Sequence, residues 1–191
     1  MVDLNLEPFP FLWGKERYFG KNYQDIVFAQ SIVSMAIPRG REAIFNSDFT
    51  KAFGTPLPEP GKFVYSNDAE FLVLWVSPDQ VFALFQREDL YPEGKIQELM
   101  GEVGYFTDQT DNWCQIRLTG PQVIQALERI CPLDLDLRQF PVGSCARTVM
   151  EHLSSMIIRE SEEGFLLLSP SSSSESFLET IEQSFLNIGD F

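Results

Sequence analysis

The chain has 191 residues, enough for one domain of ordinary size or for two small lobes that share a core. Hydrophobic residues make up 44% of it and include 17 Phe, so it can bury a core and is not a disordered tail. Its formal net charge of −14 repels phosphate backbones and anionic lipid headgroups, which argues against nucleic acid and membrane surfaces as partners.

Residues 1–25 are rich in aromatic side chains, among them Phe9, Phe11 and Trp13, but they show neither a helical nor a strand period. A disordered tail rarely carries so many aromatic residues. The segment therefore either folds over its own domain or lies against another chain. We predict that a single domain follows it, over residues 26–191.

Residues 26–104 predict a first lobe of that domain. The run FLVLWV at 71–76 is apolar throughout, which is typical of a strand that is covered on both faces. The predicted elements are a strand at 26–37, a helix at 46–53 with Asn46 or Ser47 as N-cap and Gly54 beyond its end, a short strand at 63–65, a hairpin at 71–85 and a helix at 94–103.

Residues 105–191 predict a second lobe with the same order of elements. A Pro-Leu turn follows the first helix of each half, at Pro56 and again at Pro132. The predicted elements are a strand at 113–119, a helix at 121–130 that opens on Pro121, a short strand at 148–150, a hairpin at 155–168 and a helix at 175–188. The fold class is therefore α+β, with duplicated β-α-β-β-β-α lobes, antiparallel sheets and a shared core.

The sequence offers no set of groups that would converge on a reaction. His152 is the only histidine and has no nucleophile-elbow context, and no glycine-rich phosphate-binding motif is present. The three cysteines, Cys114, Cys131 and Cys145, are an odd number without C-x-x-C spacing, which argues against a disulfide framework or a zinc site. We predict no catalytic, cofactor-binding or metal-binding residue in this chain.

Cysteine usage also indicates a reducing compartment. The first residues lack the basic and apolar regions of a signal peptide. No apolar run approaches the roughly 18 residues that a spanning helix needs. We therefore expect a cytoplasmic protein.

The stretch 113–148 contains the most distinctive sequence motifs of the chain. It contains a Gly-Pro helix start, the run Cys-Pro-Leu-Asp-Leu and the pattern Phe-Pro-x-Gly-x-x-x-x-Thr. It resembles the gamma subunit of heterotetrameric sarcosine oxidase. The hairpin sequence VLWVSPDQ at 73–80, and Arg39-Gly40 followed by Phe49, Gly54, Leu57 and Pro58, resemble the same family, so that the resemblance extends from about residue 30 to residue 187.

The resemblance implies a fold like the folate-binding domain of the aminomethyltransferases, the glycine-cleavage T-protein group, which is itself a duplication. The hairpin around Arg159 also looks like a degenerate form of one in that group. The N-x-x-G-G-x-x-x-D motif, which supplies the folate-contacting acid there, is absent from this sequence.

The resemblance also implies a role. A gamma subunit is non-catalytic and packs against the alpha subunit, in an assembly with beta and delta subunits that oxidatively demethylates sarcosine to glycine. FAD, FMN, NAD and tetrahydrofolate belong to the partner subunits. Two alternatives stay open: a stand-alone folate- or small-molecule-binding protein, and a subunit of a related N-methyl amino acid dehydrogenase.

A subunit of this kind needs an apolar contact surface. The first candidates are Phe9, Phe11 and Trp13, because their segment has no predicted place in either lobe. Trp113 and Phe140 are added as further interface candidates, for which the other interpretation is an ordinary place in the core.

Overall fold

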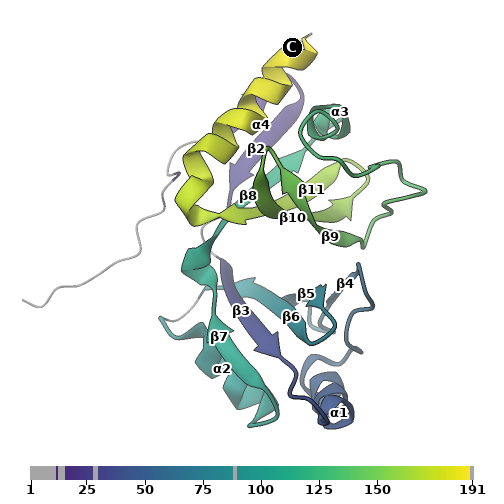
Figure 1. The fold of residues 1–191 in the computed structure, drawn as a ribbon, viewed down its shortest axis with the longest axis vertical. Coiled ribbons are helices and arrows are strands. Elements are labelled where there is room, and N and C mark those ends of the chain that lie inside the picture. Colours follow the sequence, from purple (N-terminus) through teal and green to yellow (C-terminus); the bar gives the residue numbers. More distant parts are fainter. Residues whose placement is uncertain (1–11, 13–15, 28–29, 88–89, 190–191) are drawn as a thin grey trace, which may run out of the picture.

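Two antiparallel sheets lie face to face, and each carries two helices on its outer side (Figure 1). This computed structural model describes Leu12 and residues 16–27, 30–87 and 90–189. The layers run helix, sheet, sheet, helix. The predicted α+β class with antiparallel sheets is confirmed.

The five-stranded sheet has the order β4-β5-β6-β3-β7. Helices α1 (Glu42–Phe53) and α2 (Pro92–Met100) cover its outer face and bury Phe45, Phe49 and Ile96 against it. Its strands are β3 (Gln30–Ala36), β4 (Phe63–Tyr65), β5 (Phe71–Ser77), β6 (Gln80–Gln86) and β7 (Tyr105–Asp108).

The six-stranded sheet has the order β1-β2-β8-β11-β10-β9. Helices α3 (Val123–Leu127) and α4 (Ser174–Ile188) cover its outer face. Its strands are β1 (Arg17–Phe19), β2 (Asn22–Ile26), β8 (Trp113–Thr119), β9 (Cys145–Met150), β10 (Leu153–Ser161) and β11 (Gly164–Pro170). Short 3₁₀ turns, η1 (Thr110–Asn112) and η2 (Ser171–Ser173), precede β8 and α4.

The facing sheets share a core, as the sequence predicts. Successive residues of a strand point to opposite faces. In β5, Leu72 and Leu74 therefore pack between the sheets against β10 and β11, while Phe71 and Val73 pack under the helices. This double burial explains why the run FLVLWV has no polar position.

The strand orders reveal a repeat with exchanged strands. From β4 the first sheet reads β4-β5-β6-β3-β7, and from β9 the second reads β9-β10-β11-β8-β2 before β1 is added. Strand β2 precedes β3 in the chain but pairs with β8, and β7 precedes β8 but pairs with β3. Each unit thus gives its first strand to the sheet of the other.

Segments 61–63 and 143–145 join the two sheets at equivalent positions of the repeat. Lys62 and Ser144 form an isolated antiparallel bridge, and the Lys62 Nζ donates to Ser144 Oγ at 3.0 Å. Reciprocal backbone bonds flank the bridge, from Phe63 N–H to Gly143 O at 3.1 Å and from Cys145 N–H to Gly61 O at 2.9 Å. The sheets are therefore stitched together as well as packed.

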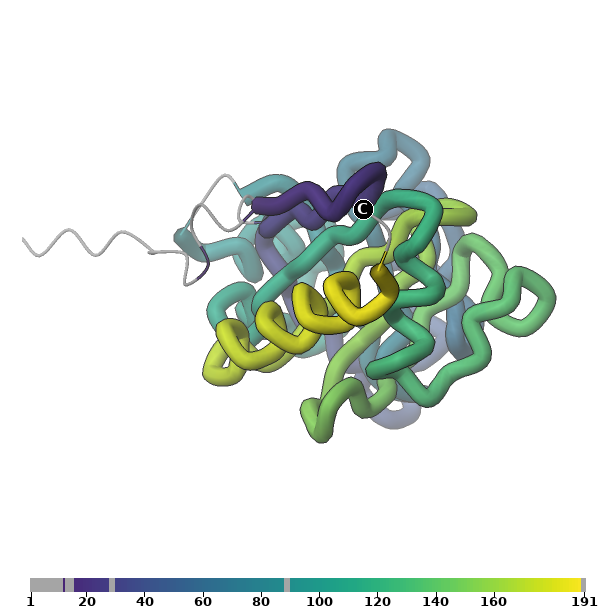
Figure 2. The backbone as a smooth tube through the Cα atoms, turned by 90° about the horizontal axis from the view of Figure 1, so that it is seen from above, coloured from purple at the N-terminus to yellow at the C-terminus, as the bar shows by residue number. Residues whose placement is uncertain are grey.

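The N-terminal segment takes part in the second sheet, which the sequence did not predict. Leu12 is 1% exposed within the core under α3 and α4. Strands β1 and β2 extend the sheet beyond β8 (Figure 2). Arg17 of β1 pairs with Glu182 of α4 at 3.1 Å. Because β2 joins the second sheet and β7 the first, sheet membership does not follow the predicted boundaries at 25/26 and 104/105.

Several predicted helix limits are wrong. Helix α1 begins at Glu42 with Arg41 as N-cap, not at Asn46 or Ser47, because a turn from Pro38 starts the helix and the Glu42 carboxylate accepts from Gly40 N–H at 3.0 Å. The predicted Gly54 terminus is confirmed, with a left-handed φ of 69°. Helix α2 ends one turn earlier than predicted, at Met100.

Helix α3 spans five residues rather than the predicted 121–130. Pro121 lies in the turn before it, and the Asn22 side chain accepts from Gln122 N–H at 2.8 Å. The Arg129 and Ile130 N–H groups bond three residues back, which ends the helix in a tight turn. The predicted strand at 26–37 corresponds to β3, which is shorter, at Gln30–Ala36, while Ile26 ends β2 in the other sheet.

Candidate interface

Among the residues that the structure describes, the titratable side chains do not assemble into a reactive centre. His152 lies in the tight turn between β9 and β10 with a φ of 71°. Burial raises the pKa of the Cys114 thiol to about 12 and that of Cys145 to about 11. These thiols stay protonated at neutral pH and are poor nucleophiles. No group of acids, cysteines and histidine in the described part of the chain could hold a metal ion.

Arg159 is a fully buried guanidinium whose role is structural. It donates to the carbonyl oxygens of Leu135 at 2.7 Å and Phe140 at 2.8 Å, and to that of Glu162 at 2.6 Å. The Cζ atom of Arg159 lies 5.0 Å from the centre of the Phe165 ring, and burial lowers the pKa of the guanidinium. The side chain thereby ties the loop that carries Phe140 to the hairpin of β10 and β11.

Arg117 and Glu160 form a second internal pair, on the inter-sheet face. Two hydrogen bonds join them, at 2.7 Å and 3.1 Å. Burial, with the Glu160 carboxylate as the next cause, raises the pKa of the Tyr65 phenol. Because Arg117 and Glu160 neutralise each other, the pair links strands β8 and β10 of the second sheet and leaves no free cation for a ligand.

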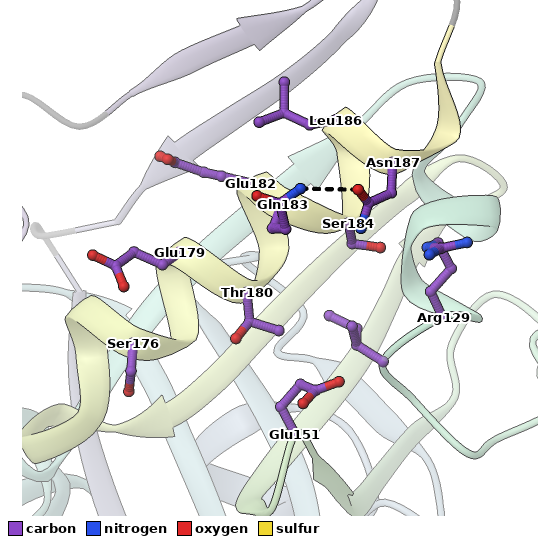
Figure 3. Close-up of a pocket in the computed structure, with 11 residues that line it drawn as sticks. Arg129, Glu151, Ser176, Glu179, Thr180, Glu182, Gln183, Ser184, Leu186 and Asn187 are labelled. Carbon is purple, nitrogen blue, oxygen red and sulfur yellow. Dashed lines mark hydrogen bonds between the residues drawn. The ribbon is translucent and has the colours of Figure 1, made fainter.

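A polar groove lies between α4, the end of α3 and the turn before β10 (Figure 3). Arg129 and Glu151 line it opposite the solvent side of α4, which contributes Glu179, Gln183 and Asn187. The Gln183 amide donates to the Asn187 oxygen at 2.9 Å. The lining can hydrogen-bond a polar ligand, but it joins no nucleophile to a base.

Trp113 and Phe140, two of the predicted interface residues, lie in different cores. Trp113 begins β8, is half-buried between the sheets and meets Phe82 edge-on at 6.0 Å between ring centres. Phe140 is 8% exposed within the core under α3 and α4, at the other end of the sheet, beside Arg159. Phe9, Phe11 and Trp13 lie outside the described residues.

Unpaired polar atoms surround Trp113. Its buried Nε1 has no hydrogen-bond partner in the described structure, and the same holds for the Oε1 atoms of Gln30 and Gln115. The Gln115 amide donates to the backbone oxygen of Gln30 at 3.2 Å, so the three side chains share one region. Gln115 is only 4% exposed. This region therefore retains hydrogen-bonding capacity, since buried polar groups in native proteins normally find partners.

Apolar side chains are also exposed along α2 and β7, which pack together. Leu99 shares the helical spacing of the buried Ile96 and Met100, but 43% of it is exposed. The other exposed side chains of this flank are Leu90 at 63%, Tyr91 at 73% and Tyr105 at 70%. The apolar pair just before Pro92 was the available signal, because Pro favours the first position of a helix, but the predicted helix began only at residue 94. The helices of the described residues include none long and apolar enough to cross a membrane.

The sequence is similar to curated gamma subunits of sarcosine oxidase. The relative from Arthrobacter sp is 27% identical over 147 residues, which cover 76% of this chain and 70% of the relative. The relative from Corynebacterium sp. (strain P-1) is 27% identical over 154 residues, with 80% and 73% covered. No protein-family model matches the chain.

The fold is similar to two solved structures. Heterotetrameric sarcosine oxidase from Corynebacterium sp. U-96, in complex with pyrrole 2-carboxylate, matches with a TM-score of 0.76 and 21% identity over 89% of this chain and 86% of that one. The glycine cleavage system aminomethyltransferase T from Bartonella henselae matches with a TM-score of 0.65 and 12% identity over 84% of this chain and 45% of that one. The predicted likeness to both folds is confirmed. In sequence, this chain is similar to curated gamma subunits of sarcosine oxidase, and its fold is similar to that of a chain of the heterotetrameric enzyme.

Proposed function

We propose that this chain is the non-catalytic gamma subunit of a heterotetrameric sarcosine oxidase, and that it packs against the alpha subunit. The sequence relationship to curated gamma subunits carries the proposal, since it covers at least 70% of each of the two relatives described above. The fold match to the heterotetrameric enzyme supports it. In this proposal the chain contributes surface and shape to the assembly, which oxidatively demethylates sarcosine to glycine.

The cofactors of the reaction belong, in this proposal, to the alpha, beta and delta subunits. FAD, FMN, NAD and tetrahydrofolate are assigned to those partners. The buried thiols and the arginines Arg117 and Arg159 support a structural role. The thiols are buried, and both guanidinium groups hydrogen-bond inside the protein, so none of these groups is available for a reaction. The cytoplasm is the proposed location, on the cysteine usage described above.

The proposed contact surface includes Trp113, beside the unpaired polar atoms of Gln30 and Gln115. Although its N–H is buried, the indole ring is only half-buried, and exposed aromatic rings are common anchors in protein interfaces. Phe9, Phe11 and Trp13 remain proposed members of the surface, whereas Phe140 is buried in the core under α3 and α4.

Co-expression tests the proposal. The tagged chain is produced together with the products of the neighbouring genes for the other subunits, and the purified material is assayed for sarcosine oxidation. We expect the chain to bring down the other subunits and their activity, and the isolated chain to be inactive. A chain that elutes alone, or that oxidises sarcosine by itself, would contradict the proposal.

A titration distinguishes the proposed subunit role from the alternative of a stand-alone folate-binding protein. Isothermal titration of the isolated chain with tetrahydrofolate should give no heat of binding if the chain acts only as a subunit. Binding at micromolar or lower concentration would favour the alternative.

A further inference from the structure

The two halves of the repeat differ at one edge. In the six-stranded sheet, β1 covers the outer side of β2. In the five-stranded sheet the equivalent strand, β7, is terminal (Figure 1). The residues that would correspond to β1 belong instead to the end of α2. Within the described part of the chain, the position beside β7 has no strand.

Burial differs accordingly between the two equivalent strands. The helix-facing residues of β2 are closed off from solvent: Asn22 and Gln24 are 0% exposed and Ile26 is 4% exposed. The helix-facing residues of β7, Phe106 and Asp108, are only half-buried. The strand that has a neighbour is thus fully buried on its helix-facing side, and the strand without one is only half-buried there.

The backbone of β7 presents free pairing groups at this edge. The Gln109 N–H donates to Ile32 O at 2.8 Å, as the equivalent Val27 N–H donates to Gln115 O at 3.0 Å. Antiparallel ladders alternate between bonded and non-bonded pairs. Thr107 therefore bonds inward to β3, while the N–H and C=O groups of Phe106 and Asp108 point outward, as those of Gln24 point toward Arg17 of β1.

We propose that an extended segment of a partner subunit adds to β7 as a sixth strand. The inference rests on the proposed function, since it assigns a contact to the assembly in which the chain would act. Exposed edges recruit strands in this way, with backbone bonds giving affinity and alternate side chains giving specificity. The position of β1 in the other half shows that the fold accommodates a strand there.

The packing of β1 in the other half indicates which side chains a strand added to β7 would carry. In the other half, Phe19 of β1 is 8% exposed and stacks on Phe185 of α4 at 4.8 Å between ring centres. An apolar side chain of the added strand would meet α2 in the same way, beside the half-exposed Leu99.

The negative charge around β7 favours a basic partner segment over a second copy of this chain. Glu98 and Glu102 are exposed beside β7, and Asp108 lies within it. Two copies would bring together two chains of formal charge −14, and like charges across an interface oppose association. The occupant is therefore an extended segment with Lys or Arg on its outer side and an apolar residue facing α2.

Amide hydrogen exchange of the isolated chain and of the co-expressed complex tests the proposal. On assembly, the amides of Phe106 and Asp108 should exchange at least about tenfold more slowly. The amide of Thr107, already bonded to β3, is the internal control and should change little. A complex in which 106 and 108 exchange as in the isolated chain overturns the added strand and leaves the proposed function intact. Failure to form a complex overturns both.

Amide exchange of the isolated chain shows whether something other than a partner subunit pairs with the edge of β7. Protection at 106 and 108 that rises with protein concentration would assign the edge to a second copy. Protection that is independent of concentration, and lost when residues 1–11 are removed with the core residue Leu12 kept, would assign it to this chain's own N-terminal segment. Either result overturns the partner strand.

Charge reversal gives a second readout. The double variant Glu98→Lys and Glu102→Lys should weaken assembly by about tenfold, because it makes the edge repel a basic segment. Glu175→Lys with Glu179→Lys makes the same change of charge on α4, in the other half, and should leave assembly unchanged. Equal effects of the two double variants would overturn the proposal.

Discussion

Arg159 shows how a buried charge can be wholly structural. We expect Arg159→Met to lower the free energy of unfolding by about 3 kcal/mol, because it leaves the buried carbonyls of Leu135 and Phe140 without donors, at about 1–3 kcal/mol each. Urea denaturation followed by circular dichroism measures this. Arg138→Met, in the loop that carries Leu135 and Phe140 but with an exposed guanidinium, is the control and should barely move the midpoint. Equal midpoints for both variants would refute the structural role.

The buried thiols predict how stability depends on pH. Burial raises the pKa of Cys114 to about 12 and that of Cys145 to about 11, whereas an unfolded thiol titrates near about 8.5. Above that pH the unfolded chain loses these protons and the folded chain keeps them. The stabilisation is therefore complete below about pH 8.5 and is lost as pH rises toward the folded values.

Unfolding free energies at pH 8 and pH 10 check this dependence. The wild-type protein should lose stability between the two values, and Cys145→Ala should lose less. A variant with the same pH slope as the wild type would show that the thiol contributes nothing to it.

Residue roles were only partly predictable from the sequence. The absence of a phosphate-binding motif and the isolation of His152 are visible in the chain itself. The buried position of Arg159 was not, because a strand pattern does not show which loop carbonyls will close over a guanidinium. The exposure of Leu99 was missed because helical spacing gives the apolar face but not where that face ends.

At the level of elements, β1 is three residues long yet completes a core. We expect Phe19→Ala to cost about 3–4 kcal/mol, the usual range for emptying a buried Phe site. Its neighbour Tyr18 is 77% exposed, so Tyr18→Ala should change stability little. Thermal or urea unfolding of the two variants gives the comparison, and similar losses in both would mean that β1 does not pack as described.

Long apolar elements were predictable, and short polar ones were not. The hairpin of β5 and β6 and helix α4 follow directly from their apolar runs and helical period. Strands β1 and β2 are only three and five residues long and contain few apolar side chains, so no period identifies them. Helix α3 was overestimated because the side chain of Asn22, 100 residues earlier, fixes the turn at its start.

At the scale of the whole molecule, the order of elements predicted two lobes with a shared core. It did not predict that β2 and β7 are exchanged between the sheets, because the choice of a pairing partner is not local to either strand. The exchange makes each half depend on the other for a strand. It also leaves the halves unequal, since β1 covers one exchanged strand and the edge of β7 stays open.

Native mass spectrometry of the co-expressed subunits tests the proposed role most directly. The account predicts one complex in which a single copy of this chain, of 21.8 kDa, accompanies the other subunits of a sarcosine oxidase. A complete, active oxidase that lacks this chain, with the chain itself found only as a free species, would contradict it.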